Sequence, residues 1–196
     1  NPMFKFFLLF IILINPFQKK FPTNWVLKKD VNQIKVYLRN IDENNKEYFA
    51  KTIVNSDINS ISSIIMDYNT SYEWMYKLES SKILSEESDS LIYVYFTVDM
   101  NWPLKKRDLV SNVIVSKGEN KMIIELNSTP DYININLDYE RIKDTKSIWT
   151  LEFLEKNKTK VSLRSYAVIE GIPTFISDLF ILESPIYSLN KLRNFF

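Results

Sequence analysis

Apolar and polar residues alternate along most of this 196-residue chain. In 122–127 the apolar residues face one way and the polar ones mostly the other, and 147–154 repeats the pattern. Such alternation is typical of antiparallel strands that bury only one face. We therefore expect a curved antiparallel sheet with one apolar, concave face. The expected strands are 34–39, 48–54, 82–84, 91–98, 109–116, 122–127, 132–139, 147–154 and 160–169.

Two segments have helical periodicity instead. Asp57 precedes a short apolar run at helical spacing and is expected to cap a helix that ends near Tyr68. Apolar residues also recur in steps of three and four from residue 172 to 196, where Pro173 stands at the expected helix start. Pro185 is expected to kink or split this second helix. Because its long apolar stripe must be covered, we expect an α+β fold in which the sheet wraps around a long C-terminal helix.

The composition excludes several classes of protein. The chain has no cysteine and no histidine, so it has no disulfide, no thiolate nucleophile, no Ser-His-Asp triad and no imidazole metal ligand. Its two glycines, Gly118 and Gly171, are far apart and cannot form a Gly-rich phosphate loop. The 25 basic and 24 acidic residues are scattered without a basic stripe. We expect no enzymatic activity, no metal, no cofactor and no nucleic-acid partner.

The first twenty residues differ from the rest. Lys5 is followed by nine apolar residues, 6–14, a run of about 14 Å as a helix, which is too short to span a bilayer. A basic residue before a short apolar run is typical of a secretory signal peptide. We expect residues 1–20 to be a signal peptide or N-terminal anchor, and 21–196 to be the domain. The domain would be exported after cleavage or tethered to a membrane without it. The alternative is an apolar helix that packs on the domain or a neighbouring chain.

Three parts of the chain form a recognisable series of motifs. Segment 102–110 reads Trp-Pro-Leu-Lys-Lys-Arg-Asp-Leu-Val and precedes an expected middle strand, segments 25–30 and 33–37 open the domain, and 170–173 forms the turn before the last helix. In this order they resemble START-type lipid-binding domains: 102–110 is similar to the family's P-x-x-x-R-D motif, and the other segments resemble its opening strands and its last turn. The resemblance covers about residues 25–196. It implies a helix-grip fold with an internal hydrophobic cavity, between sheet and C-terminal helix, that holds one hydrophobic molecule.

The candidate cavity wall combines the apolar faces of two strands with the start of the last helix. Its residues are Met122, Ile124, Leu126, Trp149, Leu151, Phe153, Phe175, Ile176 and Leu179. Two small residues near this wall, Ser165 and Ala167, leave room for empty volume. A solid core would show the same apolar pattern, because protein interiors normally pack without voids.

The motif residues Trp102, Pro103, Arg107 and Asp108 are expected to be structural. Arg107 and Asp108 would position the start of a strand through charge-assisted hydrogen bonds to backbone or carboxylate groups. A catalytic role is the alternative, but the sequence supplies no nucleophile or base beside them.

We therefore expect the chain to bind, and to transfer, a lipid or other hydrophobic small molecule, with transient membrane contact. One alternative is an enzyme on the same fold, a cyclase or aromatase, which needs a tyrosine, arginine or carboxylate aimed into the cavity. Another is a ligand-free interaction domain with a solid core. A cavity of about 300 Å³ or more would argue against the solid core. A buried group with a strongly shifted pKa would favour the enzyme.

Overall fold

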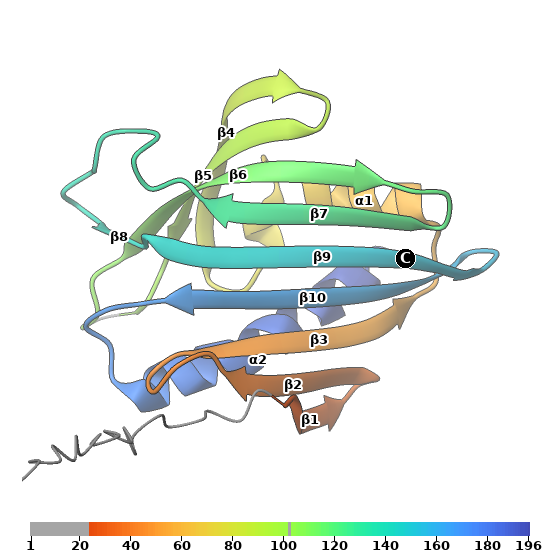
Figure 1. The fold of residues 1–196 in the computed structure, drawn as a ribbon, viewed down its shortest axis with the longest axis horizontal. Coiled ribbons are helices and arrows are strands. Elements are labelled where there is room, and N and C mark those ends of the chain that lie inside the picture. Colours follow the sequence, from red (N-terminus) through yellow and green to blue (C-terminus); the bar gives the residue numbers. More distant parts are fainter. Residues whose placement is uncertain (1–23, 102) are drawn as a thin grey trace, which may run out of the picture.

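The computed structural model describes residues 24–101 and 103–196 (Figure 1). Residues 1–20, expected to form a signal peptide or anchor, and Trp102 of the motif lie outside the described residues. The elements in chain order are β1 (Val26–Val31), β2 (Ile34–Asn40), β3 (Lys46–Val54), α1 (Ile58–Met66), a 3₁₀ turn (Ser71–Glu73), β4 (Leu78–Ser88), β5 (Leu91–Val98), β6 (Arg107–Lys117), β7 (Lys121–Ser128), β8 (Glu140–Arg141), β9 (Asp144–Glu155), β10 (Lys158–Val168) and α2 (Thr174–Arg193).

Within these residues the strands form one curved sheet. Its order is β1-β2-β3-β10-β9-β7-β6-β5-β4, and each neighbouring pair is antiparallel. The short β8 pairs with β6 in parallel, off this path. Both helices lie on the same side of the sheet, with α2 behind β3 and β10 (Figure 1). This confirms the predicted α+β architecture, a curved antiparallel sheet around a long C-terminal helix.

The core lies between the concave face of the sheet and the helices. Alternate residues of most strands point into it, as the side-chain period of two requires, whereas β1 is exposed along its whole length. In β9, for example, Trp149 and Leu151 are buried, and the Trp149 ring lies 6.0 Å from the ring of Trp74. The second half of α2 covers this face with Leu189 and Leu192, both fully buried. The end of α2 is therefore the part most firmly packed on the sheet.

Local sequence signals account for several element boundaries. The Asp57 carboxylate accepts hydrogen bonds from the backbone N–H groups of Asn59 and Ser60, so the predicted cap of α1 is confirmed. Asn32 and Gln33 have positive φ values of 52° and 62°, the conformation that a two-residue hairpin turn between β1 and β2 needs.

One expectation about the elements was wrong, and of the two outcomes expected at Pro185, a kink or a split, the split was wrong. The segment 132–139 is a loop, not a strand, although its apolar residues alternate. The three Asn and Asp residues between them favour turns, and Arg141 binds backbone carbonyl groups of the segment. Pro185 does not split α2, which continues as one helix through it. Among the described residues, neither helix has the length and apolar character needed to cross a membrane.

Candidate ligand-binding pocket

A pocket of about 330 Å³ opens between the first half of α2 and the adjoining ends of β3 and β10. The β2–β3 loop lies beside the start of α2 and completes the rim (Figure 1). The lining residues come from these four parts of the chain and from the turn between β10 and α2. They are Asn44, Asn45, Lys46, Tyr48, Ser165, Tyr166, Ala167, Ile169, Ile172, Ser177, Asp178, Phe180, Ile181 and Ser184.

The inner end of the pocket carries a cluster of hydroxyl groups around buried Tyr48, in which the three serines are partly buried. Strand register brings three of them into one row, because Ser165 pairs directly with Tyr48 of β3 and with Ser147 of β9. The Tyr48 hydroxyl is hydrogen-bonded to those of Ser165 and Ser184, and Ser147 and Ser165 are joined by a 2.7 Å hydrogen bond. Ser184 reaches the row from α2. The result is a continuous chain of hydroxyls across two strands and a helix.

Burial controls the chemistry of Tyr48. Only 8% of this residue is exposed, and desolvation raises the pKa of its phenol to about 12. The phenol therefore remains protonated at neutral pH and acts as a hydrogen-bond donor or acceptor rather than as a base.

An ion pair closes the rim. Lys46 Nζ lies 2.5 Å from Asp178 Oδ1 and joins the start of β3 to the second turn of α2. Both side chains are partly exposed, so the pair contributes little to stability. Its effect on the pocket is electrostatic, because each charge of the rim is compensated by the other.

Apolar groups form the remaining wall. Ala167 of β10, Ile169 and Ile172 of the following turn, and Phe180 and Ile181 of α2 all face this space. A small residue at Ala167 leaves volume that a larger side chain would fill. The other nine of the fourteen lining residues carry polar side chains, so the pocket is more polar than most small-molecule sites, which combine an apolar wall with a few polar groups.

Arg107 fixes the turn that carries part of this wall. It is almost fully buried and donates to the carbonyl oxygens of Lys105 at 2.7 Å and Glu170 at 3.2 Å. Its guanidinium also pairs with the Glu140 carboxylate at 2.5 Å. Because Glu170 directly precedes Gly171, where φ is +74°, these bonds position the β10–α2 turn. The neighbouring Pro103 is exposed and does not line the pocket.

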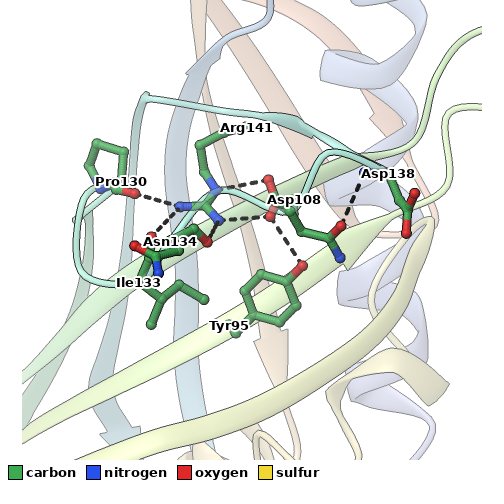
Figure 2. Close-up of polar contacts among 8 residues, drawn as sticks. Tyr95, Asp108, Pro130, Ile133, Asn134, Asp138 and Arg141 are labelled. Atoms are coloured by element: carbon green, nitrogen blue, oxygen red, sulfur yellow. Dashed lines mark hydrogen bonds and ion pairs between the residues drawn. The ribbon is translucent and has the colours of Figure 1, made fainter.

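Asp108 makes a separate buried pair with Arg141 (Figure 2). The guanidinium binds both carboxylate oxygens, at 2.8 and 2.9 Å, and Tyr95 donates to the same carboxylate at 3.1 Å. Arg141 also binds carbonyl oxygens of the β7–β8 loop, as Figure 2 shows. Arg107 and Asp108 thus make charge-assisted bonds of the expected kind, but to other residues rather than to each other.

The predicted cavity wall does not coincide with this pocket, although all nine of its residues are described. Met122, Ile124, Trp149 and Leu151 are buried in the packed core, Leu126 and Ile176 are partly buried, and none of these six lines the pocket.

The prediction is wrong for Phe153, Phe175 and Leu179. Their side chains are 50%, 67% and 57% exposed, so they form no enclosed wall. Phe153 lies near the end of β9, past the covered part of the sheet. Phe175 and Leu179 share with Glu183 the exposed face of α2, since residues four apart lie on one side of a helix.

The sequence signalled only part of the true lining. Ser165 and Ala167 were singled out as small residues that leave space, and both line the pocket. Tyr48, Ser184 and the Lys46–Asp178 pair were missed. Polar residues at inward positions of β3 and α2 were the signal that could have found Tyr48 and Ser184.

Among the described residues, no group of three acidic, histidine or cysteine side chains could hold a metal ion. The pocket chemistry therefore consists of hydroxyl groups, the side-chain amides of Asn44 and Asn45, one ion pair and an apolar wall.

The chain is similar in sequence and in fold to several known proteins. No protein-family profile matches the chain. An uncharacterized protein from Pseudomonas aeruginosa is 27% identical over 174 residues, which cover 87% of this chain and 86% of that protein. A solved STAR-related lipid transfer protein from Xanthomonas axonopodis superposes with a TM-score of 0.80 at 26% identity, covering 87% of this chain and 97% of the other. The chain has the START-domain fold.

More distant structures share the START fold. Human StAR-related lipid transfer protein 5 superposes with a TM-score of 0.77 at 15% identity, covering 89% of this chain and 87% of that one. The Zhui aromatase/cyclase from Streptomyces superposes with a TM-score of 0.58 at 12% identity, covering 76% of this chain and 92% of that one. The START fold thus occurs in proteins named for lipid transfer and in one named for catalysis.

Proposed function

We propose that this chain binds one lipid or similar hydrophobic molecule in the pocket between β10 and α2, and transfers it. The observation that supports this most directly is the pocket itself, whose volume of about 330 Å³ lies within the range of small-molecule sites. The wall from Ala167 to Ile181 supplies apolar surface, whose burial stabilises a bound hydrophobic molecule by about 25 cal/mol per Å². The solved STAR-related lipid transfer protein adds support from the fold.

The same pocket gives less support to the two alternatives. A ligand-free domain with a solid core would not need this space. A cyclase or aromatase would need a group that exchanges protons near neutral pH. Tyr48 is a buried group with a strongly shifted pKa, but burial raises that pKa to about 12, away from neutrality, so the shift does not supply such a group. The carrier function therefore fits the pocket best.

Native mass spectrometry of protein purified without detergent, followed by organic extraction, tests the proposal. We expect a co-purifying hydrophobic molecule at about one per chain. Ala167→Phe should remove it, because the larger side chain fills the pocket. Val168→Phe is the matched control, since the next residue of a strand points to the opposite face. Thermal unfolding of both variants checks that they remain folded.

Two results would count against the carrier. A bare mass for the wild-type chain, with no uptake of fluorescent fatty acids, phospholipids or sterols, would reject ligand binding. Equal ligand content in folded Ala167→Phe and Val168→Phe would place the ligand outside this pocket.

A further inference from the structure

The size of the pocket limits what it can enclose. Its volume of about 330 Å³ lies at the lower end of the range for small-molecule sites, about 300–1,000 Å³. The pocket therefore fits one chain or one compact ring system better than the two full acyl chains of a phospholipid.

The hydroxyl cluster offers hydrogen bonds at the inner end. Ser147, Ser165, Tyr48 and Ser184 carry four O–H hydrogens, and three hydrogen bonds connect the four groups. One hydrogen therefore remains to be donated outside this cluster, and several oxygen lone pairs remain to accept. Three of the four residues, all but Ser147, line the pocket. A ligand atom at this position can thus accept one hydrogen bond or donate one.

The charges around the pocket select against an ionised head group. The rim charges, Lys46 and Asp178, already compensate each other. A carboxylate or phosphate at the rim would compete with Asp178 for Lys46 and would bring like charges together. At the inner end the same group would meet hydroxyls instead of a cation, and burying a charge without a partner is costly.

We infer that the ligand is an uncharged amphiphile with one apolar chain or ring system and a single hydroxyl or carbonyl group, which hydrogen-bonds to the Tyr48–Ser165–Ser184 cluster. This inference rests on the proposed function and deepens it. The apolar part of the ligand lies against Ala167, Ile172 and Ile181, and its polar group points inward.

Calorimetric titration of the full chain with three probes tests this orientation. The probes are decan-1-ol, decanoate at pH 8, and vesicles of dioleoyl phosphatidylcholine. We expect decan-1-ol to bind at least tenfold more tightly than decanoate, and no transfer of phosphatidylcholine to the protein. Tyr48→Phe and Ser184→Ala should each weaken decan-1-ol binding about five- to tenfold, the effect of one hydrogen bond.

Tyr37→Phe provides the matched control. It removes the same phenolic oxygen from the opposite face of the sheet, where the Tyr37 ring packs 6.0 Å from the Phe49 ring. Decan-1-ol should bind this variant as it binds the wild type. Ser184→Ala replaces a helical residue with the best helix former, so it separates loss of binding from loss of folding.

The possible results separate a wrong head-group assignment from a wrong carrier function. Equal affinities for decan-1-ol and decanoate, or wild-type binding by both Tyr48→Phe and Ser184→Ala, would overturn the head-group assignment while the carrier function stands. Uptake of phosphatidylcholine alone would overturn the size limit. Binding of none of the three probes would overturn the inference and the proposed function together.

Discussion

Replacing Arg141 with methionine removes the cation that neutralises buried Asp108. The Asp108 side chain is fully buried, and it would lose two hydrogen bonds of 2.8 and 2.9 Å. The carbonyl oxygens that Arg141 binds in the β7–β8 loop would lose their donor as well. Breaking a buried pair by removing one partner costs about 3–5 kcal/mol. For a chain of this size we expect the midpoint of thermal unfolding to fall by about 6–20 °C.

Circular dichroism during thermal and guanidinium unfolding measures this loss. Lys146→Met is the matched control, because its pair with Glu125, 2.9 Å apart, is more than one-third exposed and should contribute less than about 1 kcal/mol. The double variant Asp108→Asn/Arg141→Met should recover part of the loss, since it leaves no unpaired carboxylate. If Arg141→Met is no less stable than Lys146→Met, the buried pair does not stabilise the loop as argued.

Two further predictions concern the core and the start of α1. Leu151→Ala should lower the free energy of unfolding by about 2–5 kcal/mol, because Leu151 is fully buried. Phe153→Ala should lower it by only about 1 kcal/mol, because Phe153 is half exposed. Equal losses in denaturant titrations would contradict the placement of Leu151 in the core and Phe153 outside it. Hydrogen bonds from Ser60 lower the pKa of Asp57 below its usual 3.8 in the folded state. The contribution of its carboxylate is therefore present above that value and is lost as pH falls through the lowered pKa. The difference in unfolding free energy between wild type and Asp57→Ala should be larger at pH 6 than at pH 2, and a difference independent of pH would contradict the assignment.

Local pattern predicted most of the fold because most strands bury one face. The segment 91–98 was predicted with the same bounds as β5, because turn residues flank it and only one of its faces is buried in the core. The same criterion failed for 132–139, where alternation of Ile and Asn imitates a strand. What holds this segment as a loop is Arg141, whose partner Asp108 lies 33 residues earlier in the chain. A window of ten residues contains no information about that pairing.

The pocket was harder to predict than the fold for a related reason. Ser165 stood out within its own strand because it is small, but Tyr48 and Ser184 join it only through strand register and the rotation of α2. The apolar stripe of α2 predicted a buried face correctly near Leu189, while Phe175 at its start is exposed. Helical spacing fixes which residues share a face. It does not fix which part of the helix the sheet covers.

The pairing of β3 with β10 determines when this domain can fold as it is synthesised. Glu47 and Arg164, which form an ion pair between these strands, are 117 residues apart in the chain. Until β10 leaves the ribosome, one edge of β3 remains unpaired. The part of the concave face that α2 covers stays exposed until α2 has also emerged. Contacts of such high sequence separation slow folding and expose nascent chains to aggregation. We expect the nascent chain to depend on chaperones until α2 has emerged.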